Sequence, residues 1–466
     1  MRRIIPLGLG IVLGGPAAAQ SAPEAWKPPT LTITRYDEDW SNLADAAERT
    51  GHWTERFKYV PLGNDAYATT GFELRVRNED YHNNLWGGGP APDDGYVWVR
   101  AIPHVDLHLG RVRAFVQPIA AYAIGVRPAA SPIDQTRTDL LQGFADVRLG
   151  EAKTGDTTGT GVTLRAGRQM LSLGTERLIG TRYGPNVPLA FDGFRALASL
   201  NGTVVSLLAV RPVQPGPGTF DDRRLRTKSL WGAYATIPVG SAGFDLYYLG
   251  YRNARATFGA LTGRELRHSV GARWFGDLRT WHWNVEGVAQ FGRFAGQPIG
   301  AWTLGTELGR RFPATRFSPD LVMRVNYASG DRNPDDRRLG TFNALFPKGK
   351  YFGELSPVGP YNLINVNPQA SVSLGGRVSA TLAGMAYWRA SRGDGVYDIP
   401  GNLIRAPGTT RARFVGKEAE AVIAWQATTE WEVSASLSAF VPGGFIRATG
   451  SARTITMLGL ESNFRF

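Results

Sequence analysis

The chain has 466 residues with 57 glycines, 22 phenylalanines, 16 tyrosines, 13 tryptophans and no cysteine. A disulfide-stapled fold is therefore excluded, and no segment beyond the N-terminus has the roughly 18 to 20 unbroken apolar residues of a spanning helix. The formal charge is +12, but the arginines are spread along the chain rather than gathered in a stripe, so we expect no nucleic-acid partner.

The first residues, MRRIIPLGLGIVLGGPAAAQ, combine two arginines, a short apolar run and a small-residue site. This order predicts a secretory signal peptide, cleaved near Ala19 or Gln20. A transmembrane anchor is the alternative, but glycines and prolines interrupt the apolar run. The chain is therefore predicted to be exported.

Short runs of alternating apolar and polar residues recur from Gly71 to the C-terminus. In GFELRVR (71–77), Phe72, Leu74 and Val76 share one face and Arg75 and Arg77 lie on the other. This period of two predicts strands, about 18 in all when weaker runs are included. Further examples are RVRAFVQPIAAYA (111–123), GFADVRLG (143–150), VTLRAGR (162–168), HWNVEGVAQF (282–291), LVMRVNYA (321–328) and TITMLGLESNFRF (454–466).

The spacers between these runs alternate between short and long. Short spacers lie at 107–111, 200–204, 238–242, 276–280, 375–377 and 426–430. Long gaps lie at 78–94, 124–139, 169–191, 212–228, 253–266, 330–368 and 389–412. This alternation predicts an all-β fold, an antiparallel transmembrane β-barrel of the bacterial outer membrane with short periplasmic turns and long extracellular loops.

In such a barrel one face of every strand meets lipid, which makes outer-membrane lipid a predicted partner. Phe464 and Phe466 are then expected in the periplasmic aromatic girdle of the last strand. The outward positions also include Trp274, Trp283, Trp388 and Trp425. Interfacial indoles are favoured at those positions.

These observations divide the chain into a signal peptide (1–20), an N-terminal periplasmic segment (21–70) and an outer-membrane β-barrel (71–466). Residues 24–63 precede the first strand. We interpret them either as a periplasmic tail that meets an export scaffold or as part of the lower wall of the pore.

The inward face of the predicted strands is rich in arginine. The candidates on strands are Arg75, Arg77, Arg100, Arg113, Arg148, Arg165, Arg195 and Arg324, accompanied by carboxylates such as Asp146. A low-dielectric wall focuses a basic excess into the pore, which should attract anions and repel cations. The alternative is that these arginines pair with carboxylates across the strands and stiffen the barrel.

The gap 169–191 is long, rich in glycine and basic. It follows Arg168, contains Arg177 and Arg182, and ends before Asp192. We expect this loop to fold into the mouth or lumen and narrow it, held by an Arg–Asp pair. An ordinary solvated external loop is the alternative.

Two stretches resemble a known family. RYDEDWSNLADAAERTGHWTERFKYVPLG (35–63) and LRAGRQMLSLGTERLIGTRYGPNVPLAFDGFRA (164–196) are similar to segments of the alginate-export outer-membrane channels. The resemblance implies an eighteen-stranded monomeric barrel whose arginine-lined constriction passes an anionic uronate polymer. It therefore implies an anionic polysaccharide as the partner.

The predicted function is an outer-membrane channel that exports an alginate-like exopolysaccharide, and the alternative is a general anion-selective porin. The predicted polymer track is Arg75, Arg77, Arg113, Arg148, Arg165 and Arg195, with Asp146 and Asp192 holding arginines in place. An enzyme is not expected, because His104 and His108 flank Asp106 without a nucleophile motif or metal-ligand spacing. We therefore expect no catalytic residue, metal or cofactor.

Overall fold

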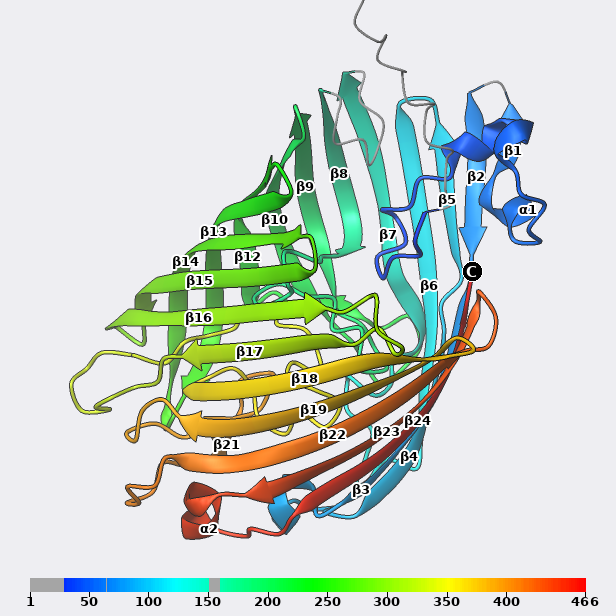
Figure 1. The fold of residues 1–466 in the computed structure, drawn as a ribbon. Coiled ribbons are helices and arrows are strands. Elements are labelled where there is room, and N and C mark those ends of the chain that lie inside the picture. Colours follow the sequence, from blue (N-terminus) through cyan, green and yellow to red (C-terminus); the bar gives the residue numbers. More distant parts are fainter. Residues whose placement is uncertain (1–28, 64, 151–159) are drawn as a thin grey trace, which may run out of the picture.

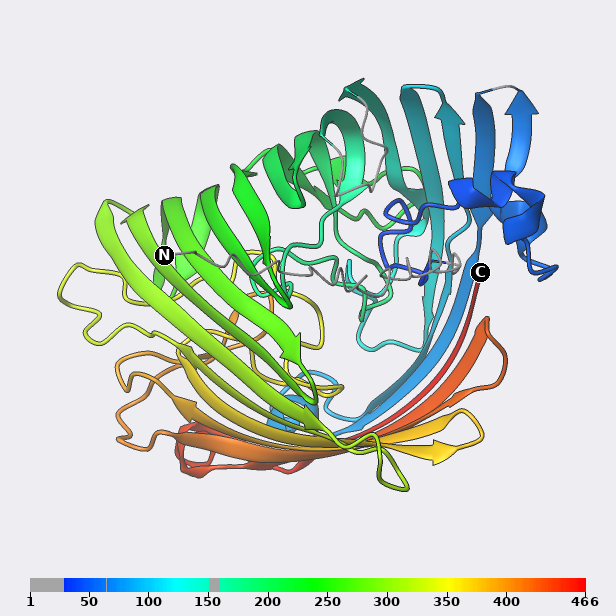
Figure 2. The ribbon, with the colours of Figure 1, turned by 45° about the horizontal axis from the view of Figure 1, so that its top comes forward.

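The computed structural model describes residues 29–63, 65–150 and 160–466, and its strands form one closed ring (Figures 1 and 2). Neighbouring strands pair antiparallel, and the last strand, β24 (Ile455–Arg465), pairs with β3 (Glu73–His82). Figure 1 shows β24 in red beside β3 in blue. Closure leaves no free edge in the wall, as a hydrocarbon environment requires. No helix among the described residues is long and apolar enough to cross a membrane.

The wall is built from strands that follow one another in chain order. Before β24 they are β2 (Ala66–Gly71), β3, β4 (Asp94–Ala101), β5 (His104–Leu109), β6 (Val112–Ile124), β7 (Arg137–Gly150), β8 (Gly161–Met170), β9 (Ala190–Leu200), β10 (Thr203–Gln214), β12 (Lys228–Val239), β13 (Ala242–Phe258), β14 (Leu261–Leu278), β15 (Trp281–Phe294), β16 (Gln297–Arg311), β17 (Asp320–Ala328), β18 (Leu363–Gly375), β19 (Val378–Arg389), β22 (Phe414–Gln426) and β23 (Trp431–Pro442). The remaining elements are short: β1 (Val60–Gly63), β11 (Arg223–Arg224), β20 (Val396–Tyr397), β21 (Leu403–Arg405), η1 (Ser41–Ala44), η2 (Ala46–Glu48), η3 (Asn84–Gly87), α1 (Glu55–Lys58) and α2 (Gly444–Thr449).

Two strands of the barrel are each broken into halves. Only Phe72 separates β2 from β3. Ile102 and Pro103 separate β4 from β5, and the strands β4 and β5 both pair with β6. Proline has no N–H to donate, so the ladder is interrupted there. With each broken strand counted once, the barrel has 18 strands, which confirms the predicted fold.

The two ends of the barrel differ in the length of their connections. The end at which β2 begins and β24 ends, here called the terminal rim, has two-residue turns at 110–111, 201–202, 240–241, 279–280 and 376–377. The opposite end, here called the loop rim, carries the long connections 83–93, 125–136, 171–189, 215–227, 329–362, 390–413 and 443–454. Most of the predicted alternation in loop length is therefore present.

The prediction of a long gap between strands at 253–266 is wrong. Strands β13 and β14 continue through it and meet at the loop rim in a turn of only Gly259 and Ala260. Gly259 has φ +57°, the left-handed conformation that such tight turns use. The polar composition of this stretch favours a loop, but buried Ala256 and Phe258 keep the alternation of a strand.

The side chains alternate between the two faces of the wall. On β3, Leu74 and Val76 are exposed on the outer face, and Arg75 and Arg77 are buried inside. Trp425 is exposed on the outer face near the terminal rim, where an indole suits the boundary between hydrocarbon and headgroups. The predicted inward and outward faces therefore hold on β3, and Trp425 of β22 faces outward as predicted.

The N-terminal segment lies against the last residue of the barrel. The rings of Trp53 and Phe57 lie 5.2 and 5.5 Å from that of Phe466, and Phe466 continues the ladder by donating its N–H to Phe72 at 3.0 Å. Trp53 and Phe57 thus lie beside the end of the last strand, whereas Tyr36 reaches into the lumen and donates its hydroxyl to the carbonyl oxygen of Met170 at 2.7 Å. The signal peptide (1–20) lies outside the described residues, and the predicted domain boundaries stay a prediction.

Candidate functional site

Two connections of the loop rim fold back into the barrel and meet there (Figure 2). They are loop A (residues 171–189) and loop B (residues 329–362). Gly180 donates its N–H to Phe346 at 2.8 Å, and Phe346 donates to Leu178 at 2.8 Å. Phe346 is buried against the rings of Phe191 and Tyr251 from the wall. The two loops therefore narrow the lumen as one packed unit.

Two of the predicted pore arginines hold loop A. Arg75 donates to the carbonyl oxygens of Tyr183 and Pro185 at 3.0 and 2.7 Å. Arg100 donates to the same two oxygens at 3.1 Å each and pairs with Glu73 at 2.6 Å. Arg75 is 3% exposed and Arg100 is fully buried. These two side chains therefore bind the loop.

The base of loop A is closed by the predicted Arg–Asp pair. Arg168, at the end of β8, donates to Asp192, near the start of β9, at 2.8 Å. The ion pair joins the residues on either side of the loop. Loop A therefore folds inward, the first of the two interpretations given above.

The N-terminal segment covers two further arginines of the predicted track. Arg113 donates to the carbonyl oxygen of Tyr36 at 2.6 Å, and the guanidinium of Arg165 lies 4.2 Å from the centre of the Tyr36 ring. Asp146 accepts hydrogen bonds from Arg165 at 2.8 and 2.9 Å, and Asp106 accepts two from Arg113 at 2.7 and 2.6 Å. Asp146 thus holds an arginine as expected, but both arginines are nearly inaccessible to solvent.

Arg77 is the centre of a cluster that ties loop B to the wall. It lies 2.5 Å from Glu79, 2.6 Å from Glu354 and 2.8 Å from Glu461. Lys350 bridges Glu79 and Glu354 at 3.0 and 2.8 Å. Although burial opposes it, the cations of Lys350 and Arg77 lower the pKa of Glu354 to about 2. The cluster is internally paired.

Beside this cluster the lumen contains an open cavity of about 510 Å³. Loops A and B line one side of it, and β15 to β19 and β22 line the other. Arg177 of loop A projects into the lining, donates to the hydroxyl of Tyr351 at 2.9 Å and pairs with Glu286 at 3.2 Å. Arg324 on β17 pairs with Glu307 at 2.5 Å. Two predicted arginines therefore reach the cavity.

Lys348 of loop B differs from the other cations of the cavity. Among the described residues, no carboxylate oxygen lies within 4.0 Å of its ammonium group. Burial and the neighbouring cations of Arg324 and Arg177 lower the pKa of Lys348. Glu176 and Glu307 oppose this shift from a greater distance, so an anion that enters the cavity meets a positive charge that is not held in a close ion pair by the described residues. The sequence analysis missed Lys348 and Lys350, although the run PKGKY (347–351) was an available signal.

The remaining predicted arginines lie apart from one another. Arg148 is half-buried near the terminal rim and donates to the carbonyl oxygen of Gly110. Arg195 on β9 donates to the hydroxyl of Ser206 at 2.7 Å. Arg182 in loop A has a buried Nε that makes no hydrogen bond with the described residues, and burial lowers the pKa of this guanidinium. The predicted arginines thus do not form one continuous track.

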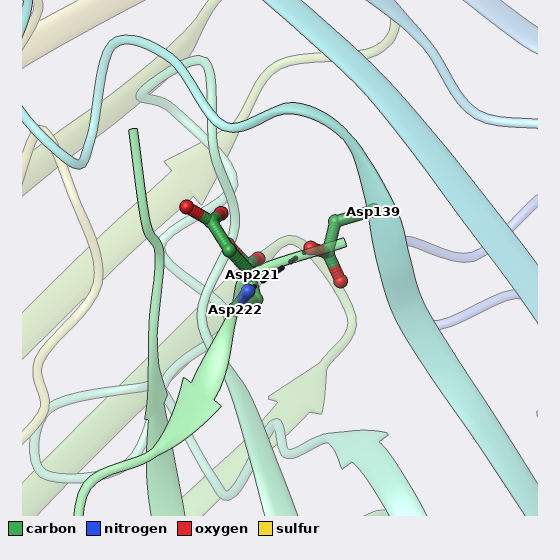
Figure 3. Close-up of side chains that lie close together, drawn as sticks. All are labelled: Asp139, Asp221 and Asp222. Atoms are coloured by element: carbon green, nitrogen blue, oxygen red, sulfur yellow. Dashed lines mark hydrogen bonds between the residues drawn. The ribbon is translucent and has the colours of Figure 1, made fainter. Parts of the chain in front are cut away.

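Three carboxylates gather where the connection 215–227 meets β7 (Figure 3). One oxygen each of Asp139, Asp221 and Asp222 lies within 4.8 Å of the others. Asp139 accepts the backbone N–H of Asp222 at 3.0 Å, and Asp222 accepts the hydroxyl of Thr136 at 2.6 Å and the N–H of Gly216 at 2.8 Å. These hydrogen bonds account for the proximity, so the group clamps the connection onto the wall.

The chain matches the family model described as alginate export over residues 66–458, which covers almost the whole barrel wall. No curated protein matches the sequence. The family and the fold are those of a transport channel.

Several solved outer-membrane barrels have a similar fold. OccK2 (OpdF) of Pseudomonas aeruginosa is 12% identical with a TM-score of 0.57, and the match covers 85% of this chain and 97% of that one. The same protein in complex with glucuronate is 11% identical with a TM-score of 0.57, and the match covers 86% of this chain and 98% of that one. OccAB1 of Acinetobacter baumannii is 14% identical with a TM-score of 0.57, and the match covers 89% of this chain and 99% of that one.

Identities this low support the fold alone, whereas the family match covers most of the chain. A closed barrel of 18 strands, its porin-like relatives and the family match together identify a protein of the bacterial outer membrane. The chain belongs to the alginate export family of outer-membrane channels.

Proposed function

We propose that this channel passes an anionic, alginate-like uronate polysaccharide through the cavity between loops A, B and the wall. In this proposal the loop rim faces outside and the terminal rim faces the periplasm, where an export scaffold would meet residues 29–63. The observation that carries the proposal is the ammonium of Lys348, which has no carboxylate oxygen of the described residues within 4.0 Å and lies in a cavity that Arg177 and Arg324 also line. Polyuronates carry one carboxylate on each sugar, which suits such a cluster of cations.

The charges in the cavity favour transient contacts. Arg177 and Arg324 already pair with Glu286 and Glu307, so a carboxylate of the solute must compete with a carboxylate of the protein. A channel needs contacts that are favourable enough for entry and weak enough for release. Lys348 supplies the attraction, and the paired arginines allow the chain to exchange contacts as it moves.

The proposed path differs from the track expected from the sequence. Arg75, Arg113 and Arg165 are buried against protein groups, so we place the path along Arg177, Arg324 and Lys348 instead. A second cavity, of about 530 Å³, lies toward the loop rim, and two cationic side chains, Lys228 and Arg255, are among its lining residues.

The alternative function is a general anion-selective porin for small solutes. The complex of OccK2 with glucuronate supports it, because a barrel of the same fold holds a single uronate. The two functions differ in how the affinity of the pore changes with the length of the solute. A polymer channel should bind a chain of uronates better than one uronate.

Blockade of chloride current in planar bilayers tests the proposal. Oligouronates should block the purified channel, whereas neutral oligosaccharides of equal length should not. The variant Lys348→Ala should raise the half-blocking concentration by about tenfold or more, because a hydrogen bond to a charged group contributes about 1.5 kcal/mol or more. Lys417→Ala is the matched control, since Lys417 is exposed on the outer face of β22.

Equal block by neutral sugars would contradict the proposal. Equal block by glucuronate and by its oligomers would favour the small-anion porin. An unchanged half-blocking concentration in Lys348→Ala would show that the path avoids this residue.

A further inference from the structure

Exposed arginines gather on the outer face of the barrel, at the loop-rim ends of β13 to β15 and beside them. We call this group the outer arginine patch; it consists of Arg252, Arg264, Arg293 and Arg338. Leu266 is the cross-strand partner of both Arg252 and Arg293, so these three side chains form one row on the same face. Arg252 and Arg293 are therefore about 10 Å apart, which is two strand spacings.

Arg338 reaches this face from loop B. Its guanidinium lies where a Cβ of Gly300 would be, and Gly300 is the cross-strand partner of the exposed Phe291. The patch thus combines three arginines of the wall with one from the loop that narrows the pore.

The patch contains no internal counter-charge. Among the described residues, no carboxylate oxygen lies within 4.0 Å of any of the four guanidinium groups. Two other arginines of this region are paired: inward-facing Arg267 lies 2.6 Å from Glu265, and Arg311 at the terminal rim lies 2.5 Å from Asp277. Several like charges on one face repel each other, so the patch is suited to an anion from outside the protein.

The patch lies directly above an aromatic row on the lipid-facing surface. Tyr248 is hydrogen bonded to His268 at 2.7 Å, and the ring of His268 stacks on Phe291 at 5.3 Å. Arg293 comes two residues after Phe291 on the same face, about 7 Å along the strand. Aromatic belts mark the boundary between hydrocarbon and headgroups. The arginines therefore lie at the depth of the lipid headgroups.

We propose that the outer arginine patch is a binding site for the phosphate groups of an anionic glycolipid of the outer leaflet. Guanidinium groups hold phosphate oxygens with paired hydrogen bonds, and the row of Arg252, Leu266 and Arg293 spans the width of one headgroup. Leu266 and Phe291 are both exposed and offer apolar contact to the lipid. Since Arg338 belongs to loop B, the bound lipid also braces the loop that narrows the pore.

A soluble anionic polysaccharide is the competing occupant. It has no acyl chains to lie against Leu266 and Phe291, and the patch is on the outer surface rather than in the lumen. The observations therefore favour the lipid. This inference depends on the loop rim facing outside and is independent of which solute the pore passes.

Native mass spectrometry of the full-length channel in detergent tests the site. The probes are a bisphosphorylated diglucosamine glycolipid, the same glycolipid without phosphates, inorganic phosphate and an oligouronate. We expect the phosphorylated glycolipid to bind best. The triple variant Arg252→Gln, Arg264→Gln, Arg293→Gln should lose about 100-fold in affinity for it, at about fivefold for each arginine.

The matched control removes the same charge from the terminal rim through Arg279→Gln, Arg316→Gln and Arg377→Gln, three exposed arginines near short turns. Its affinity should change by less than about twofold. Equal affinities for the two glycolipids would overturn the proposal, and so would equal losses in the two triple variants. Tighter binding of the oligouronate, lost in the patch variant, would assign the patch to the polymer instead.

Discussion

Replacing Arg75 by methionine should weaken the attachment of loop A to the wall while leaving the barrel intact, because Arg100 keeps its own hydrogen bonds to Tyr183 and Pro185. Arg75 donates three hydrogen bonds to carbonyl oxygens of loop A, at 3.0, 3.0 and 2.7 Å. Among the described residues, no carboxylate oxygen lies within 4.0 Å of its guanidinium, so the substitution leaves no buried charge without a partner. Methionine also fills much of the volume that the arginine stem occupies.

The expected size of the effect follows from these hydrogen bonds. A hydrogen bond to a charged group contributes about 1.5 to 3 kcal/mol. The three bonds share one guanidinium and are not additive, and carbonyl groups of a released loop regain water. We therefore expect a loss of about 3 kcal/mol of docking free energy, which changes the ratio of docked to released loop by about 100-fold.

Single-channel recording detects the released loop as a larger and noisier conductance. The control is Arg195→Met, because Arg195 is a half-buried inward arginine whose only hydrogen bond, among those of the described residues, goes to Ser206. Heat-modifiable migration on gels shows whether each variant has formed a barrel. An intact Arg75→Met barrel with wild-type conductance would refute the reasoning.

Three further predictions concern stability, orientation and pH. Arg165→Ala removes both hydrogen bonds to buried Asp146, leaves it only Arg113 at 3.7 Å and should cost about 3 kcal/mol of unfolding free energy, measured by urea unfolding. Replacing Arg165 and Asp146 together by apolar residues should recover much of this loss, and no recovery would contradict the pairing argument. A cysteine at Asn333 in loop B should react with an impermeant reagent on intact cells, and one at Ser241 should not; the opposite result would invert the orientation. Anion preference should be highest while Lys348 is protonated and should fall as the pH rises through its lowered pKa, whereas Lys348→Arg should keep the preference at high pH; identical pH profiles would exclude Lys348 as the titrating group.

The wall could be predicted because its signal is local. Leu74 and Arg75 are neighbours in the sequence, and the period of two places them on opposite faces whatever the rest of the chain does. The same rule predicted that Arg113 and Arg165 point inward. It could not predict that Tyr36, 77 residues before Arg113, covers both of them.

The interior of the barrel could not be predicted in detail, because it depends on contacts between distant segments. Arg75 holds carbonyl oxygens 108 to 110 residues further along the chain, and no pattern near Arg75 indicates this. Lys348 lies in a loop whose basic composition is equally typical of a solvated surface segment. Its role depends on how loop B packs against Phe191 and Tyr251 of the wall.

The most direct measurement is the release of fluorescently labelled oligouronate from proteoliposomes that contain the purified channel. The account predicts that the oligouronate leaves faster than a neutral dextran of equal size, and that Lys348→Ala slows the oligouronate but not the dextran. Equal release of the two polymers, or retention of the oligouronate while chloride passes, would contradict the proposal that the pore conducts an anionic polysaccharide.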